Sequence, residues 1–127
     1  MDSSVFDTES IRLKGITFEG CGRDNSIIKA ELNSGEYLFN SITGNKWQHF
    51  NFYNIGFETG SGGLLRIISG TYNENTYSTY ENHFNFHSCK FNVATLLRVD
   101  GSTNGDFEAF NDCVITSTDT MVILNNV

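Results

Sequence analysis

The chain of 127 residues contains no proline, although average usage of about 5% would give about six. Ala, Leu, Lys and Glu are sparse in every stretch, which leaves little material for helices. There is no run of about 18 apolar residues, so no membrane-spanning helix is encoded. Residues 1–10 are polar and acidic and lack the apolar core of a secretory signal. What is present, 39% hydrophobic and 13% aromatic residues with twelve glycines, indicates a folded, soluble, turn-rich, all-β protein.

Positive charge is also scarce. Eight Lys and Arg stand against 15 Asp and Glu, which gives a net charge of -7 and a pI of about 4.7. A protein that binds the phosphate backbone of a nucleic acid needs a basic face to displace counterions. We therefore expect neither a nucleic acid nor a membrane as a partner.

Cysteine and histidine are too few and too scattered to predict a metal or redox site. The three cysteines, Cys21, Cys89 and Cys113, are odd in number, and none belongs to a C-x-x-C pair. We interpret them as small, buried apolar residues. The histidines do not have the spacing of a metal triad. We therefore expect no metal and no cofactor.

A two-block repeat organises the chain. The first block, in the pattern apolar, any residue, small polar, apolar, occurs four times, at 13–18, 52–57, 86–91 and 109–115. The second block is mostly apolar and follows each first block, at 27–30, 64–67, 96–99 and 121–124. Self-similarity of this kind is typical of a solenoid, in which unequal loops extend outward between stacked coils.

Apolar and polar residues alternate within the blocks, as they do in β-strands. A tight bend is expected where each first block carries its small polar residue, at Gly15, Asn54, Ser88 and Asn111. Like residues of successive coils should then lie above each other. The expected inward stacks are Leu13, Phe52, Phe86 and Ala109; Ile16, Ile55, Cys89 and Cys113; Phe18, Phe57, Phe91 and Ile115; and Ile28, Leu65, Leu97 and Val122.

The strings Gly15–Gly20, Phe52–Phe57 and Phe86–Phe91 resemble the coil signature of the right-handed parallel β-helix of the pectate-lyase-like superfamily. The resemblance covers about 110 residues, roughly 11–124. It implies an all-β, right-handed parallel β-helix of about four coils over residues 11–127, preceded by a polar leader at 1–10. No capping helix is visible, so we expect a fragment of a longer spike.

The proline-free, acidic style, rich in Asn, Ser, Thr and Tyr, looks most like a bacteriophage tailspike or tail-fibre segment. That resemblance implies a structural role in a virion tail that faces the host surface, a homotrimer and engagement of surface glycans. Flat amphipathic rings and basic side chains suit sugars, including acidic ones. The candidate glycan-binding residues are Trp47, His49, Tyr53, Arg66, Tyr72, Tyr77 and Arg98; ordinary solvated strand faces and loops are the alternative reading.

Two predictions concern side chains that point outward. Lys29, Arg66 and Arg98 are expected to share one basic column, with Asp100 on the opposite face of its strand. An apolar outward column would need a cover, either further copies of the chain around a threefold axis or the loop at 71–82. The residues of this predicted oligomer interface are Ile27, Leu64, Leu96 and Met121.

Acidic residues raise two alternative functions. Paired carboxylates perform glycoside hydrolysis, and Glu58 and Asp112 are the candidates for a polysaccharide depolymerase, a hydrolase or a lyase. Glu19 and Glu58 are expected to stack between coils. A non-enzymatic role is favoured over an enzymatic one, because the acidic residues are distributed as expected for ordinary surface residues of an acidic protein. The second alternative is an acidic solenoid inhibitor that mimics a nucleic acid.

Overall fold

The computed structural model describes residues 16–42, 48–68, 82–100 and 107–125. The described residues form strands and turns without a helix. The strands are β1 (Ile16–Glu19), β2 (Ile27–Leu32), β3 (Tyr37–Ile42), β4 (Gln48–Tyr53), β5 (Gly56–Gly60), β6 (Gly63–Ile68), β7 (Asn82–His87), β8 (Lys90–Val93), β9 (Thr95–Asp100), β10 (Phe107–Asn111), β11 (Val114–Ser117) and β12 (Val122–Asn125).

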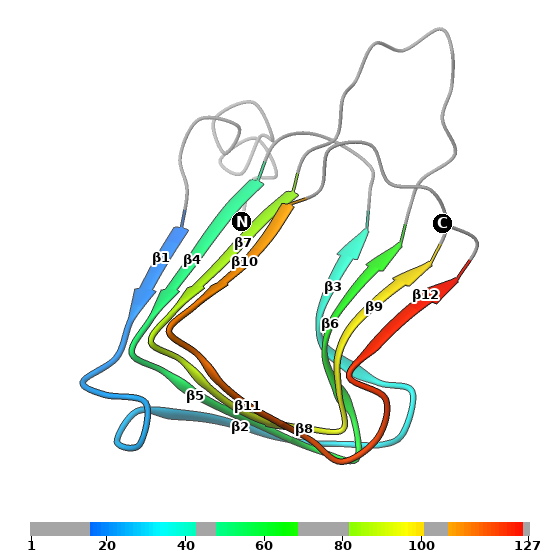
Figure 1. Cartoon of the computed structure of the whole chain (residues 1–127), viewed down its shortest axis with the longest axis horizontal. Coiled ribbons are helices and arrows are strands. Elements are labelled where there is room, and N and C mark those ends of the chain that lie inside the picture. Colours follow the sequence, from blue (N-terminus) through cyan, green and yellow to red (C-terminus); the bar gives the residue numbers. More distant parts are fainter. Residues whose placement is uncertain (1–15, 43–47, 69–81, 101–106, 126–127) are drawn as a thin grey trace, which may run out of the picture.

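Three consecutive strands make one coil, and four coils stack into a parallel solenoid (Figure 1). Sheet A contains β1, β4, β7 and β10; sheet B contains β2, β5, β8 and β11; sheet C contains β3, β6, β9 and β12. Every pairing within the sheets is parallel. Sheets A and C face each other, and sheet B joins them along the base. The predicted all-β parallel solenoid of about four coils is confirmed.

The predicted stacks are confirmed where they join the second and third coils. Phe52 pairs with Phe86, and Phe57 with Phe91. The rings of Phe57 and Phe91 stack with centroids 5.3 Å apart, and both side chains are buried. The spacing of aromatic and small polar residues was therefore sufficient to set the register of these coils.

The first coil was assigned wrongly. Phe18 stacks on Phe52 rather than on Phe57, and the partner of Phe57 is Ile28. The position over Leu65 belongs to Phe39. The first coil carries a loop at 21–25 that the other coils lack, and its third strand is β3, so aligning 27–30 with the third strands of later coils was an error.

A left-handed residue makes the bend between sheets A and B. Asn54, Ser88 and Asp112 have φ angles of 57°, 51° and 51°. The bend of the fourth coil therefore lies at Asp112 rather than at the predicted Asn111, and Phe110 takes the stack position predicted for Ala109. In the first coil Gly20 rather than Gly15 matches Asn54. A Cβ on Gly20 would lie 2.5 Å from the Asn54 carbonyl oxygen, so the close approach requires glycine there.

Stacked phenylalanines form the centre of the core. One column runs Phe18, Phe52, Phe86 and Phe110, with ring centroids 5.0, 5.0 and 5.1 Å apart. Phe91 meets the Phe86 ring edge-on at 5.2 Å. Such offset and edge-to-face arrangements match the charge distribution of aromatic rings and add to the free energy from area burial.

The cysteines do not share one environment. Cys89 is buried, and its thiol donates to the Phe52 carbonyl oxygen at 3.5 Å. Burial raises the pKa of the Cys89 thiol. Cys113 is half-buried and Cys21 is exposed. The interpretation of the cysteines as buried apolar residues therefore holds for Cys89 but not for Cys21.

The loop at 21–25 lies across the corner between sheets A and B. Arg23 Nη1 donates to the Asp112 carbonyl oxygen at 3.0 Å, and Asp24 Oδ1 accepts from Lys90 Nζ at 2.7 Å. A Cβ on Gly56 would lie 2.5 Å from the Arg23 carbonyl oxygen, so glycine lets the loop pack closely on the second coil. The first coil thereby contacts all three others.

The phenylalanine column predicts a gradient of stability effects. Phe86→Ala should lower the free energy of unfolding by about 3 to 5 kcal/mol, because it opens a cavity around a side chain that is 0% exposed. Phe18→Ala, in the same column but 43% exposed, should cost less than half of that. Urea denaturation of both variants measures the difference. Equal losses would contradict the assigned burial.

Candidate functional site

The outward face of sheet A carries rings and amides. His49 stacks on His83 with centroids 4.4 Å apart, and Tyr53 stacks on His87 at 4.7 Å. The side-chain amide of Asn85 donates to Asn51 Oδ1 at 3.1 Å, which forms an inter-coil amide pair.

The stacking limits what these rings can bind. Within each pair the interplanar angle is small, 18° for the histidines and 7° for Tyr53 with His87. Each ring therefore has one face covered by the ring in the adjacent coil. What this surface offers a ligand is mainly hydrogen-bonding edges, rather than the open ring faces expected at His49 and Tyr53.

The outward face of sheet B is concave. A hollow of about 400 Å³ is lined by Lys29, Glu31, Glu58, Gly60, Asn92, Val93, Thr116 and Thr118. Lys29 Nζ lies 3.3 Å from Glu31 Oε1 and 3.9 Å from Glu58 Oε2. The hollow thus combines two carboxylates around one ammonium group.

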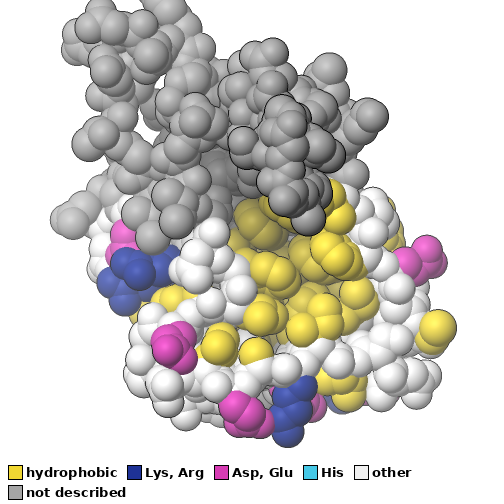
Figure 2. Space-filling model, turned by 180° about the vertical axis from the view of Figure 1, so that it is seen from behind, with side chains coloured by type: hydrophobic (Ala, Val, Ile, Leu, Met, Phe, Trp, Pro, Cys, Tyr) yellow, Lys and Arg dark blue, Asp and Glu magenta, His cyan; other side chains and the backbone are white. Residues whose placement is uncertain are grey.

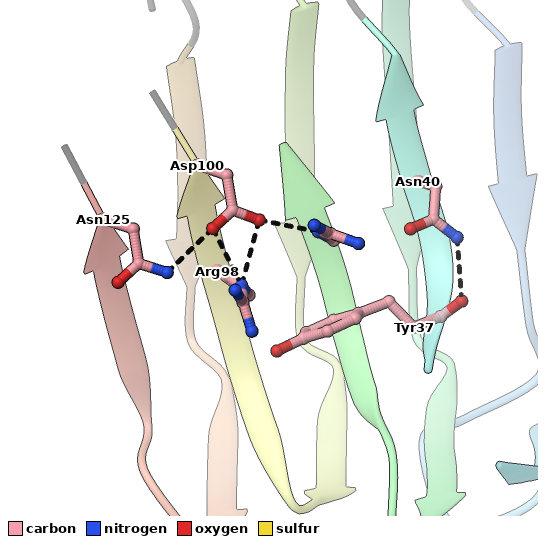
Figure 3. A network of polar contacts seen from close by, with 6 residues as sticks. Tyr37, Asn40, Arg98, Asp100 and Asn125 are labelled. Atoms are coloured by element: carbon pink, nitrogen blue, oxygen red, sulfur yellow. Dashed lines mark hydrogen bonds and ion pairs between the residues drawn. The ribbon is translucent and has the colours of Figure 1, made fainter. Parts of the chain in front are cut away.

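The outward face of sheet C has the densest polar network of the described residues (Figure 3). Asp100 lies at its centre. One carboxylate oxygen, Oδ2, accepts from Arg66 Nε at 2.7 Å, and both oxygens accept from Arg98 Nε at 2.9 Å. The side-chain amide of Asn125 donates to Oδ1 at 2.8 Å. Three coils therefore converge on one carboxylate.

Strand geometry explains the convergence. Arg66 pairs with Arg98 in register, and Asp100 pairs with Asn125. Residues two apart on one strand project to the same face, so Arg98 and Asp100 are neighbours. The expectation that Asp100 lies on the opposite face was wrong because it overlooked this two-residue period.

Hydrogen bonds determine the pKa values in this network. The hydrogen bond from Asn125 and the bonds from Arg66 and Arg98 lower the pKa of Asp100 to about 2, against the effect of its burial. The hydrogen bond to Asp100, together with one to Tyr37, raises the pKa of Arg98. Two guanidinium groups share one carboxylate, so this cluster keeps a net positive charge in an acidic protein.

The structure brings only some of the predicted glycan-binding residues together. Arg66 and Arg98 are adjacent on sheet C, whereas His49 and Tyr53 lie on sheet A. Trp47, Tyr72 and Tyr77 lie outside the described residues. Lys29 does not continue the arginine column, because it pairs with Glu58 in sheet B; Asn40 takes that position.

The two catalytic candidates do not form a pair. Glu58 lies in the hollow of sheet B, while Asp112 is at the corner bend, where Oδ2 accepts from the Ser88 hydroxyl at 2.9 Å. Glu19 does not stack on Glu58, because its partner is Tyr53. Sequence reasoning missed Glu31, whose position two residues after Lys29 was the available signal.

The predicted apolar outward column is wrong for two of its four residues. Leu64 is 0% exposed and Leu96 is 4% exposed, and both belong to the core. Ile27 and Met121 are exposed, but Ile27 pairs with Gly56 in sheet B and is not aligned with the other three. The observation that motivated a threefold interface is therefore absent from these positions.

Asp100 and Asn125 were not among the predicted site residues. Their signal in the sequence is the two-residue spacing from Arg98 to Asp100, combined with the repeat that places Asn125 one coil later. Among the described residues, no three His, Cys, Asp or Glu side chains gather to hold a metal ion. No helix in the described part of the chain could cross a bilayer.

Comparison with protein-family models, curated proteins and solved structures found no match.

The lowered pKa of Asp100 predicts a pH-dependent contribution to stability. A carboxylate with a folded pKa of about 2 and an unfolded pKa of about 3.9 stabilises the fold fully above about pH 4, and this contribution is lost as the pH falls towards 2. The difference in unfolding free energy between wild type and Asp100→Asn should therefore shrink between pH 4 and pH 2.

Urea denaturation at pH 7, 4, 3 and 2 measures this difference. Asp119→Asn is the control, because the exposed Asp119 side chain makes no ion pair within the described residues. A difference that stays constant from pH 7 to pH 2 would contradict the role assigned to Asp100.

Proposed function

We propose that the protein is a structural and receptor-engaging β-helix segment, which binds acidic glycans through Arg66 and Arg98 on sheet C. The observation that carries this proposal is the adjacent arginine pair held by one carboxylate. Asp100 fixes both arginine side chains through their Nε atoms. Their conformational entropy is therefore already reduced before a ligand binds, which lowers the entropic cost of binding.

The remaining donors suit a carboxylate or a sulfate. Within the described parts of the chain, the Nη groups of both guanidinium groups have no partner apart from the hydrogen bond between Arg98 and Tyr37. The side chains are 34% and 31% exposed, so they are ordered but reachable. Planar guanidinium groups bind carboxylates and related anions with paired hydrogen bonds.

The net charge of -7 disfavours the binding of a polyanion, but only the charges close to the binding surface matter. Salt screens exposed charges beyond a distance of about 8 Å at physiological ionic strength. In sheet C the neighbours of the arginine column are Asn40 and Ile123, which are uncharged. An acidic sugar at this surface would therefore meet two arginines and one carboxylate.

The wider setting that we propose is a phage tailspike or tail fibre, on the outside of the virion. A parallel solenoid suits that role, because its strands pair along the full stack and leave outward faces for a receptor. The homotrimer expected from the sequence is not carried into this proposal, because Leu64 and Leu96 of the apolar column that motivated it are buried.

The arginine pair predicts selective binding. The double variant R66Q/R98Q should bind a uronic-acid polysaccharide about tenfold or more weakly than wild type, because it loses two charge-assisted contacts. The control K29Q/K90Q removes the same charge from sheet B and should retain binding. Isothermal titration calorimetry at 0.15 M salt, with a neutral glucan beside it, measures both effects.

Equal losses in the two double variants would contradict a site on sheet C and indicate an effect of net charge alone. Binding of the neutral glucan as tightly as the acidic polymer would also contradict the proposal. Urea denaturation of each variant establishes that it is folded.

The hollow of sheet B favours a polysaccharide depolymerase as the second candidate. Glu31 and Glu58 both contact Lys29 Nζ, so these carboxylate oxygens are no more than about 7 Å apart. Glycosidases place their two carboxyl groups about 5 to 9.5 Å apart, one to protonate the leaving oxygen and the other as base or nucleophile. The carboxylate pair is therefore Glu31 with Glu58, and Asp112 has no part in it.

This candidate predicts polysaccharide cleavage that depends on sheet B. Glu58→Gln should lower the release of reducing ends from a polysaccharide by about a hundredfold or more, because an acid–base group is lost. Asp112→Asn should leave the rate unchanged. A wild type without cleavage, or Glu58→Gln with full activity, would contradict the candidate.

A further inference from the structure

The two ends of the solenoid carry nearly all of the exposed large apolar side chains. Among the described residues, only Tyr53 of this class lies in an inner coil. The first coil contributes Ile16, Phe18, Ile27 and Ile28, and the fourth contributes Val114, Met121, Val122 and Leu124. Figure 2 shows one end, where apolar side chains occupy the centre and polar and charged ones form much of the rim.

Two columns of the core reach both ends with apolar residues. Phe18 and Phe110 are the terminal members of the phenylalanine column, whose spacing stays at 5.0 to 5.1 Å. The column of Phe57 and Phe91 ends at Ile28 and Ile115. A further coil on either side would therefore continue these two columns without a change of residue class. The column of Phe50 and Phe84 differs, because it ends at Glu108 in the fourth coil.

The first-coil end of the solenoid contains a cavity. Phe39 leans inward, with its ring 5.3 Å from Phe52 and 6.2 Å from Phe84, so it contacts the second and third coils. A cavity of about 220 Å³ remains beside it, lined by Phe18, Leu38, Phe39, Asn40, Phe50, Phe52 and Phe84. The cavity is mostly apolar and large enough for a branched aliphatic side chain.

The fourth-coil end carries a matching protrusion. Leu124 is 61% exposed, the largest value among the exposed apolar side chains. Its column runs Ser41, Ile67, Val99 and Leu124, and its first-coil position lies on β3, the strand whose Leu38, Phe39 and Asn40 line the cavity. A coil placed in register on the first coil would bring its Leu124 over Ser41.

The outward residues at the two ends are also compatible. In register, Asn111 would meet Glu19, and Thr116 would meet Lys29. On sheet C, Ile123 would meet Asn40. None of these pairs places like charges opposite each other, a contact that would weaken strand pairing.

We propose that the chain associates with a second copy of itself, head to tail. The strands β10, β11 and β12 of one copy pair in parallel with β1, β2 and β3 of the next, and Leu124 enters the cavity beside Phe39. Free strand edges supply the backbone hydrogen bonds, and the apolar end faces supply the burial. Such an interface uses different surfaces on the two copies, so it propagates into rods instead of closing into a ring.

Two variants with one blocked end each test this interface. Leu124→Asp should prevent a copy from using its fourth-coil end, and Phe18→Asp should block the first-coil end. Each variant alone should sediment as a monomer at concentrations where wild type forms a series of oligomers. An equimolar mixture should form one dimer and nothing larger, because it contains one intact pair of ends. Sedimentation velocity at neutral pH measures all four samples.

Several results would overturn the proposal. Wild type that remains a monomer over the full concentration range would do so, as would a single closed trimer that neither variant disrupts. A dimer of Phe18→Asp alone would show that two fourth-coil ends meet each other. If only a chain without residues 1–15 associates, those residues cover the first-coil end in place of a second copy.

Urea denaturation establishes that both variants are folded. Ile28→Lys replaces Phe18→Asp if the latter does not fold, since Ile28 lies at the same end and is also exposed. The mixture of Ile28→Lys with Leu124→Asp has the same expected outcome, one dimer, and its failure to form would refute the proposal.

Discussion

Parallel pairing at a strand spacing of about 4.8 Å places each side chain directly beside its counterpart one coil away. The phenylalanine rings use that spacing to stack, and the amides of Asn51 and Asn85 use it to form a hydrogen bond. The same constraint places Arg66 beside Arg98, although two positively charged side chains repel each other. Asp100 offsets their repulsion, so the polar cluster on sheet C is a consequence of the register of the core.

The sequence was sufficient to predict the solenoid and the register of its inner coils. Phe52, Phe57, Phe86 and Phe91 recur at fixed distances from a bend residue, and large rings tolerate few alternative registers. The first coil could not be aligned in this way. Its bend uses Gly20, followed by a loop of its own, and the contacts of Arg23 and Asp24 with the third and fourth coils leave no periodic signal.

The candidate sites were predictable only in part, for a related reason. The repeat identified Arg66 and Arg98 as neighbours, but their anchor Asp100 has no counterpart of the same type in the other coils. Outward positions are free to vary from coil to coil, because packing does not constrain them. Burial can also depart from alternation: Leu64 and Leu65 are adjacent in β6 and both are buried, whereas alternation alone would expose one of them to water.

The loop that crosses the corner between sheets A and B has a consequence for how the protein unfolds. In a solenoid each repeat contacts only its neighbours, so a terminal repeat can fray independently. Here Arg23 and Asp24 attach the first coil to the fourth and third. Detachment of the first coil must break these contacts too, which links the two extremities of the stack and favours loss of structure in a single cooperative event.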